Sequence, residues 1–284
     1  MDTVLDIKGL RKEYKTFALK DISFSLPRGY IMGFIGPNGS GKTTTLKLIM
    51  NLMKKDGGEV SVFGQDNIQF ERQIKQRISF VYDESVYYEQ LPIRAMTNII
   101  RPFYDKWDQA KYEDYLKRFE LDEKKKIKEL SKGMRTKYAL ALALSRHAEL
   151  LIMDEPTAGL DPVFRRELLD ILQDILQEEQ NSILFSSHIT SDLDRVADYI
   201  TFINSGEIVF CEEKDQVFER YTLVKGGPAD LTPELSNQLI GLSRRDTGFE
   251  GLAIGHPQGE GLVFEKPNLE DIMFYHTKGA QHGR

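Results

Sequence analysis

Hydrophobic and polar positions along this chain follow two different periods, which together outline a mixed α/β fold. Between residues 4 and 26 they alternate in short runs that end at the Pro-Arg-Gly turn at 27–29, which predicts antiparallel strands. Continuous apolar runs, typical of buried parallel strands, follow at residues 30–35, 150–153 and 182–185. Helical spacing separates these runs at residues 44–53, about 84–148 and 163–179.

Strands that alternate with helices favour a parallel sheet covered by helices. After Tyr221 the composition changes, and Gly226, Gly227 and Pro228 interrupt the pattern. We therefore expect one domain over residues 1–222, with a helical subdomain at about 84–148, and a small appended α+β domain over residues 223–284.

Composition and charge narrow the possible functions. The 284 residues carry 38 Lys and Arg against 44 Asp and Glu, a net charge of −6, which argues against nucleic acid as a partner. The single cysteine, Cys211, cannot form an internal disulfide, and Met1 leads into charged residues, so we expect a reducing cytosol. A membrane span needs about 20 apolar residues, and the apolar runs here are much shorter. A role at a membrane would need another chain to cross it.

A glycine-rich loop directly follows the apolar run at 30–35. In this loop, glycines let successive backbone N–H groups surround a β-phosphate, and the next helix points its positive end at the anion. Lysine would reach the β- and γ-phosphates, and the first threonine would bind Mg²⁺. The predicted nucleotide-binding residues are Gly36, Pro37, Asn38, Gly39, Ser40, Gly41, Lys42, Thr43 and Thr44.

Two carboxylates end the apolar run at 150–153. Asp154 would hold Mg²⁺ through water, and Glu155 would lie closer to the γ-phosphate, where it orients or deprotonates the attacking water. Alternatively, the two acids only cap the next helix. The phosphate-binding loop favours the metal and catalytic roles.

These motifs resemble the nucleotide-binding subunits of ABC transporters over residues 1–222. The resemblance implies a P-loop ABC ATPase core of α/β class with an antiparallel β subdomain and a helical subdomain, followed by the small C-terminal α+β domain. It also implies ATP and Mg²⁺ as cofactors, and a second ATP-binding subunit, identical or not, in a head-to-tail dimer. The dimer would drive a separately encoded transmembrane permease subunit from the cytoplasm, bound peripherally to the inner face of the cell membrane.

The sequence ELSKGMR at 129–135 resembles the family's signature, which contacts the γ-phosphate bound to the opposite subunit. Ser131 is a good N-cap for the helix predicted from Met134 onward, and the helix dipole would face an anion. The resemblance gives Ser131, Lys132, Gly133 and Met134 this role in trans. Lys132 and Met134 depart from the commonest version, which has glycine and glutamine. An isolated capped helix is the alternative.

Three further segments match the family's functional positions. The sequence PTAGLDP at 156–162, which includes Asp161, resembles the D-loop that crosses the dimer interface. His188, after the run at 182–185, resembles the switch histidine that hydrogen-bonds the γ-phosphate. Tyr14 resembles the aromatic residue that stacks on adenine, although a plain surface or core tyrosine is the alternative.

The clearest departure from the family follows the strand predicted at 78–82. Where the family usually has glutamine, this chain has Asp83 and then Glu84. Ionised carboxylates only accept hydrogen bonds, so a catalytic contact to Mg²⁺ or water survives and amide donation does not. Its position relative to the end of the predicted strand favours Asp83 as the counterpart of the glutamine, with Glu84 as the alternative. In the family this residue leads into the region that docks on the membrane subunit.

The sequence KPNLEDIM at 266–273 resembles the ending of ATP-binding subunits in bacterial exporters of antibiotics, bacteriocins and other peptides. We therefore expect an ATP-hydrolysing subunit of an ABC transporter that exports a peptide or antibiotic-like cargo. The alternative is a soluble ABC protein that acts as a nucleotide-gated binding module. The single phosphate-binding loop and the short separation of residues 36 and 131 argue against the translation and repair proteins of that kind.

Overall fold

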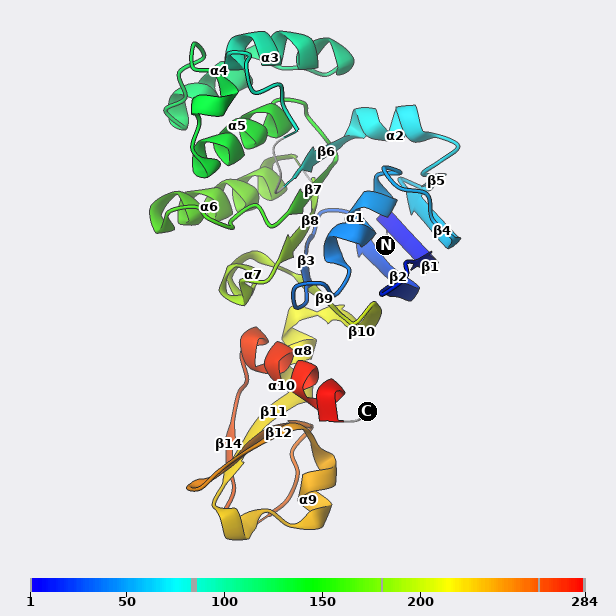
Figure 1. The fold of residues 1–284 in the computed structure, drawn as a ribbon, viewed down its shortest axis with the longest axis vertical. Helices are drawn as coiled ribbons and strands as arrows, with labels where there is room; N and C mark the ends of the chain where they lie inside the picture. The colour runs from blue at the N-terminus through cyan, green and yellow to red at the C-terminus, as the bar shows by residue number, and fades with distance from the viewer. Residues whose placement is uncertain (1, 83–85, 180, 260, 283–284) are drawn as a thin grey trace.

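The computed structural model describes residues 2–82, 86–179, 181–259 and 261–282, and a six-stranded sheet lies at the centre of these residues (Figure 1). Its strand order is β10-β9-β3-β8-β7-β6. All neighbours pair in parallel except β9 and β10, which are antiparallel. The strands are β3 (Ile31–Ile35), β6 (Ile78–Val81), β7 (Leu150–Asp154), β8 (Ser182–Ser187), β9 (Tyr199–Asn204) and β10 (Glu207–Glu213). The carboxyl ends of the parallel strands therefore share one edge.

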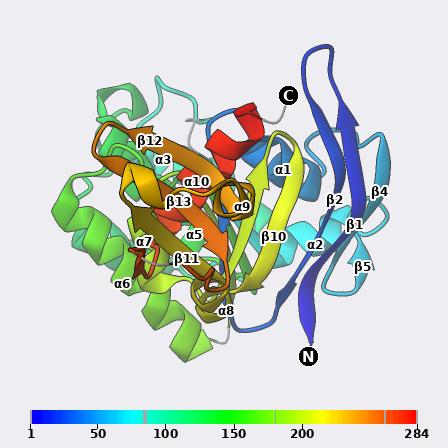
Figure 2. The ribbon, with the colours of Figure 1, turned by 90° about the horizontal axis from the view of Figure 1, so that it is seen from below.

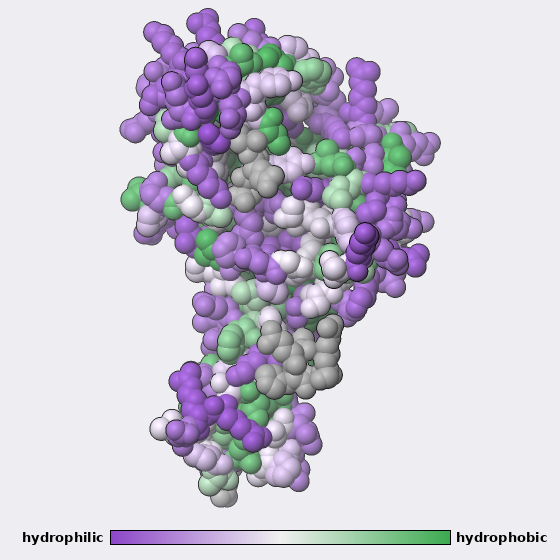
Figure 3. All heavy atoms as spheres, in the orientation of Figure 1, coloured by the Kyte–Doolittle hydropathy of each residue, from purple (hydrophilic) through white to green (hydrophobic). Residues whose placement is uncertain are grey.

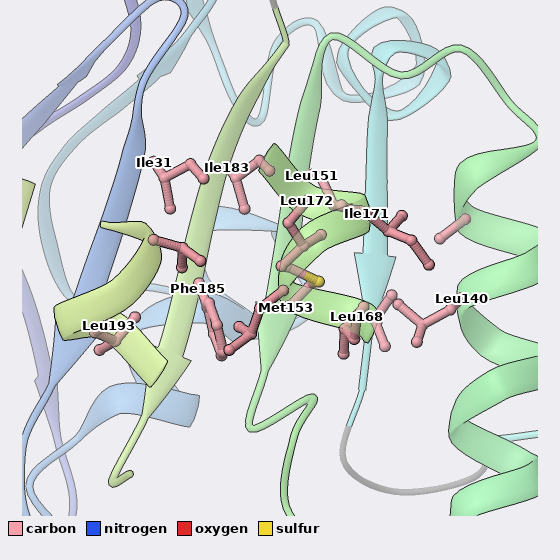
Figure 4. Packing of buried hydrophobic residues seen from close by; sticks show 14 of the residues in the cluster. Ile31, Leu140, Leu151, Met153, Leu168, Ile171, Leu172, Ile183, Phe185 and Leu193 are labelled. Atoms are coloured by element: carbon pink, nitrogen blue, oxygen red, sulfur yellow. The ribbon is translucent and has the colours of Figure 1, made fainter. Parts of the chain in front are cut away.

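Successive residues of the central strands point into two different hydrophobic clusters, because side chains alternate between the faces of a sheet. On β7, Leu151 and Met153 belong to one cluster, and Leu150 and Ile152 belong to the other. The first cluster packs against three helices, as Figure 4 shows for residues of α5 (Lys132–Leu144), α6 (Pro162–Glu179) and α7 (Thr190–Val196). Burial on both faces explains why these strands read as continuous apolar runs.

The second face is covered by α1 (Lys42–Ile49) and by an antiparallel sheet of order β2-β1-β4-β5. Its strands are β1 (Thr3–Glu13), β2 (Ala18–Pro27), β4 (Gly57–Val62) and β5 (Gln65–Asp66), and α2 (Glu71–Arg77) follows them. Figure 2 shows this sheet to one side of the molecule. The alternating pattern at residues 4–26 therefore predicted β1 and β2 correctly, whereas it said nothing of β4 and β5.

The middle region is helical, as its spacing predicted. It contains α3 (Ile93–Ile100), η1 (Arg101–Phe103), α4 (Gln109–Arg118), η2 (Ile127–Glu129) and α5. Buried hydroxyl groups link three of these helices: Thr97 Oγ1 lies 2.7 Å from Tyr112 Oη and 2.9 Å from Tyr138 Oη. This network satisfies polar groups that would be costly to bury alone.

The last part of the chain forms a third sheet, of order β12-β13-β11-β14. Its elements, after α8 (Lys214–Arg220), are β11 (Tyr221–Gly226), η3 (Pro228–Asp230), α9 (Pro233–Gln238), β12 (Leu239–Arg245), β13 (Gly248–Ile254), β14 (Val263–Glu265) and α10 (Leu269–His282). Leu269 and Ile272 of α10 are fully buried in the same cluster as Leu193 of α7. The hydrophobic core therefore continues from the central sheet into the C-terminal part.

The mixed α/β fold with an antiparallel sheet, a helical region and a C-terminal α+β part is confirmed, whereas the bounds expected for two helices were wrong. The helix expected at 44–53 begins at Lys42, directly after Gly41, and ends at Ile49 because Asn51 has a left-handed backbone (φ 51°). The helix expected from Met134 begins at Lys132.

Hydrophilic side chains cover most of the face drawn in Figure 3, with hydrophobic ones in separate small areas. Within the described ranges, no helix is both long enough and apolar enough to cross a membrane.

Candidate functional site

Three sequence-predicted segments meet at the carboxyl edge of the central sheet. Strand register places Ile35 beside Ser187, and Asp154 beside Ser186. The glycine-rich loop leaves β3 at this edge, Glu155 follows β7, and His188 follows β8. In open α/β sheets, ligands bind outside the carboxyl ends of the strands, so the topology alone brings these side chains to a binding position.

The glycine-rich loop needs glycine where the sequence has it. A Cβ atom at Gly36 would lie 2.2 Å from the Ile203 carbonyl oxygen, and Gly41 has φ +113°, a conformation that other residues avoid. Gly41 is also the N-cap of α1, and no side chain among the described residues caps that first turn. The first N–H groups of α1 therefore face the loop without internal partners, which is the arrangement that binds phosphate.

Lys42 lies under this loop with only 6% of its side chain exposed. Its Nζ donates a hydrogen bond of 2.7 Å to the Gly36 carbonyl oxygen and lies 3.4 Å from Glu155 Oε1. The ammonium group is thus held between the loop and the carboxylate by contacts that a phosphate oxygen can replace.

Glu155 is the residue at which the loop and the two strand ends converge. Its Oε2 accepts a hydrogen bond from the His188 backbone N–H at 3.2 Å and lies 2.7 Å from His188 Nδ1. Its own N–H donates to the Ser186 carbonyl oxygen at 3.1 Å. The backbone of Glu155 is left-handed (φ 50°), a conformation that non-glycine residues adopt at a cost and that often occurs at functional sites.

Asp154 is buried beside Glu155, and its Oδ1 accepts a hydrogen bond of 2.6 Å from Ser186 Oγ. Ser186 therefore orients both acidic residues, a role that the sequence interpretation missed because a serine in an apolar strand has no motif of its own. Thr43 is exposed at the start of α1. Among the described residues, no three His, Cys, Asp or Glu side chains group as a metal site.

Tyr14 lies between β1 and β2 and is 43% exposed. Its ring centroid is 6.5 Å from that of Phe17, and its hydroxyl lies 3.7 Å from Met53 Sδ. Phe17 in turn borders the phosphate loop, because a Cβ atom at Gly41 would lie 2.9 Å from Phe17 Cζ. The exposed Tyr14 ring therefore lies next to Phe17, which borders the phosphate loop.

The signature residues form a second group, at the start of α5. Ser131 Oγ accepts a hydrogen bond of 3.2 Å from the Met134 N–H, which confirms Ser131 as the N-cap. Lys132 contacts Gly159, since a Cβ atom there would lie 3.4 Å from Lys132 Cδ, and Gly133 faces Leu160. The signature and the loop at 156–162 therefore lie together in one protomer.

Asp161 caps the start of α6 from that loop. Its Oδ1 accepts hydrogen bonds from the N–H groups of Phe164 and Val163, which hold the pKa of this carboxyl below its usual range. Asp83 and Glu84 lie outside the described residues, so their catalytic and metal-binding roles stay predictions.

Known proteins with a similar sequence are ATP-binding proteins, in agreement with a phosphate-binding loop beside Glu155. The ABC transporter family matches residues 19–158. The ABC transporter ATP-binding protein YtrB of Bacillus subtilis is 32% identical over 207 residues, which cover 73% of this chain and 70% of YtrB. The bacitracin transport ATP-binding protein BcrA of Bacillus licheniformis is 30% identical over 212 residues, which cover 74% of this chain and 69% of BcrA.

Among solved structures, the ATP-binding subunit of an ABC transporter superposes with a TM-score of 0.69 at 27% identity, covering 75% of this chain and 91% of that one. The sequence matches and the shared fold indicate one family. It is the family that the phosphate loop and the acidic end of β7 resemble. The chain therefore belongs to the ABC transporter family, as an ATP-binding subunit and an ATPase of the ABC type.

Proposed function

We propose that the chain hydrolyses Mg·ATP in a head-to-tail dimer and so drives a separate transmembrane permease. Each site would combine Lys42, Glu155 and His188 of one protomer with Ser131 and Gly133 of the other. The observation that carries the proposal is the placement of Glu155, held between Lys42 Nζ at 3.4 Å and His188 Nδ1 at 2.7 Å.

The residues at the loop suit Mg²⁺, because hydroxyl and carboxylate oxygens are the donors that this ion prefers. Thr43 would contact the ion directly, and the buried Asp154 would do so through water, with the nucleotide phosphates completing the shell. Bound Mg²⁺ would neutralise charge on the phosphates. The same reasoning gives Asp83 a water-bridged contact.

The arrangement explains how Glu155 can act as the general base. Phosphate oxygens would replace the Gly36 carbonyl oxygen and Glu155 Oε1 as the partners of Lys42 Nζ. The Glu155 carboxylate would then face the γ-phosphate. Glu155 Oε2 would then accept a proton from the attacking water, while His188 turns toward the γ-phosphate. A correctly placed base contributes about 10²- to 10⁴-fold in rate.

The signature group supports the dimer. Ser131 and Lys132 are exposed at the start of α5, where the unpaired N–H groups of a helix favour an anion. In each protomer Gly133 faces Leu160 and Lys132 lies close to Gly159, so the signature adjoins the loop at 156–162. A second protomer placed head to tail would offer this surface to the γ-phosphate held by the first, which makes the site complete only in the dimer.

A groove in the helical region supports a docking site for the permease. It has a volume of about 370 Å³ between α3, α5 and β6, with Tyr87, Met96 and Ala139 in its lining. Val86 and Phe103 are exposed in the same region, at 69% each. Buried aromatic anchors dominate binding at protein interfaces. We place the chain in the cytoplasm, peripheral to the inner face of the membrane.

The similarity to BcrA, a bacitracin transport protein by its description, favours an antibiotic or peptide cargo, and the tail motif at 266–273 favours export. The alternative, a soluble nucleotide-gated ABC protein, would have no permease. Copurification with a multi-span membrane protein, if a neighbouring gene encodes one, separates the two. Asp83→Ala should keep ATP affinity within a few-fold and remove most of the permease-stimulated turnover.

The decisive experiment replaces Glu155 with glutamine, which keeps the shape and removes the base. Glu155→Gln should bind Mg·ATP as wild type does, hydrolyse it at least ~100-fold more slowly, and accumulate as an ATP-bound dimer in size-exclusion chromatography. Glu59→Gln, which changes an exposed glutamate of β4, is the matched control and should behave as wild type. Turnover near the wild-type rate in Glu155→Gln would refute the assignment of the base.

A further inference from the structure

An ion pair with a buried carboxylate joins the helix that follows the loop at 156–162 to the helix that follows His188. Arg165, in the first turn of α6, donates from Nε to Asp192 Oδ1 of α7 at 2.7 Å and from its terminal nitrogen to Ser191 Oγ at 3.0 Å. The Arg165 backbone N–H donates to the Asp161 carbonyl oxygen at 2.9 Å. This backbone bond belongs to the first turn of α6, so the position of Arg165 follows the end of the loop, while the Arg165 side chain holds the first turn of α7.

Stability alone is a poor explanation for this pair. The Asp192 side chain is only 3% exposed, and its second oxygen, Oδ2, is buried without a hydrogen-bond partner in the described residues. Withdrawing a carboxylate from water costs several kcal/mol, and replacing a buried ion pair by apolar residues is often neutral or stabilising. A half-satisfied buried charge is more readily explained by the geometry that it fixes.

The geometry that it fixes is that of His188. The helix α7 begins at Thr190, two residues after His188, and the turn between them is tied by the Ile189 N–H, which donates to Ser187 Oγ at 2.9 Å. A displacement of the first turn of α7 must therefore move His188, which contacts Glu155 at 2.7 Å.

We propose that Arg165 and Asp192 are positioning residues that hold His188 against Glu155 and make its position depend on the loop at 156–162. This inference rests on the proposed function, because the loop would lie at the dimer interface and His188 beside the γ-phosphate. A movement of the loop on dimer formation would pull Arg165, and through Asp192 it would move the histidine.

The same two helices provide a matched control. Arg195 of α7 bonds Asp170 of α6 at 2.5 Å, further along both helices. This second pair is exposed, with 35% and 49% of the two side chains accessible, and it lies at the end of α7 away from His188. Both pairs join α6 to α7, whereas only the first reaches the turn that carries the histidine.

The first measurement is steady-state ATP turnover. Asp192→Asn should lower kcat about 10-fold or more, because misplacing a catalytic group by about 1 Å costs up to about 100-fold, and leave KM for ATP within about twofold. Arg165→Lys, which keeps the charge and loses the two-pronged donor, should be intermediate. The double variant should be little worse than Asp192→Asn, because the residues act as a unit. Asp170→Asn should leave kcat unchanged.

The second measurement needs no turnover. In nucleotide-free protein labelled at histidine, the His188 ring signal, assigned by its loss in His188→Asn, should shift in Asp192→Asn and stay fixed in Asp170→Asn. The chain has five histidines, so the spectrum is simple. An unmoved His188 signal, or a fall in kcat that Asp170→Asn matches, would overturn the proposal. A wild-type protein that hydrolyses no ATP would refute the proposed function instead, while the His188 signals would still decide whether the pair positions the histidine.

Discussion

His276 of α10 should make the stability of this protein fall in mild acid. Its ring packs edge-on against Phe202, Phe210 and Tyr221, with its centroid 5.4 Å from that of Tyr221, and its Nε2 lies 3.1 Å from the Tyr221 hydroxyl. Burial among these rings, helped by the nearby Arg220 charge, lowers the pKa of His276 from 6.5 to about 4. The folded protein therefore favours the neutral ring.

The sign follows from linkage between protonation and folding. Above pH 6.5 the ring is neutral in both the folded and the unfolded chain, and the stabilising contribution is fully present. As the pH falls from 6.5 toward 4, the unfolded chain binds a proton that the folded protein does not, and stability is lost. Each pKa unit corresponds to about 1.4 kcal/mol. For these two pKa values, the unfolding free energy should fall by about 2 kcal/mol between pH 7.5 and pH 5.0. Because the ring is partly exposed to solvent, we halve this loss to about 1 kcal/mol.

The perturbation is His276→Gln, which does not titrate and keeps a partner for the Tyr221 hydroxyl. Urea unfolding followed by circular dichroism at pH 7.5 and pH 5.0 should show that wild type loses about 1 kcal/mol more unfolding free energy than the variant does. His256→Gln is the control, because His256 lies exposed in the same part of the fold, with Nδ1 3.1 Å from Thr222 Oγ1. Equal losses in wild type and His276→Gln would refute the reasoning.

Three further predictions follow from described contacts. Lys42→Ala should weaken ATP binding at least about 10-fold, since a hydrogen bond to a charged group contributes about 1.5–3 kcal/mol; titration with a fluorescent ATP analogue measures this, and unchanged affinity would remove the loop from the site. Tyr14→Ala should raise the Kd for ATP about 10-fold if the ring stacks on adenine, whereas Tyr14→Phe should not, and equal effects in the two variants would contradict stacking. Leu269→Ala, at a fully buried position, should cost about 2–5 kcal/mol of unfolding free energy, and Phe274→Ala, which changes an exposed side chain of the same helix, should be near neutral in the same urea experiment.

The sequence predicted those parts of the site that depend on local order. The apolar run before Gly36 and the run before Asp154 are continuous because both faces of their strands are buried, and parallel pairing then requires their ends to share an edge. That argument needs only the pattern and the handedness of the connections. The glycine-rich loop and the acidic strand end accordingly predicted Lys42 and Glu155 at the same γ-phosphate.

Contacts between distant segments could not be predicted in this way. Nothing in the sequence near Arg165 indicates that Asp192 will face it, and the serine that orients Asp154 lies 32 residues further along the chain. The packing of α10 on α7 is of the same kind, because its apolar residues fit any buried helix. Such pairs depend on how whole layers are placed, which local periodicity does not determine.

The packing of α10 against α7 also limits how this protein can be recombined with its relatives. Leu193 of α7 packs in one buried cluster with Leu269 and Ile272 of α10, and Lys214 Nζ donates to the Asp194 carbonyl oxygen of α7 at 2.9 Å. A chimera that exchanges only the residues after Tyr221 would bring a foreign helix onto this surface. Functional chimeras should therefore require that α7 and α10 be exchanged together, although β9 and β10, which lie between them in the chain, belong to the central sheet.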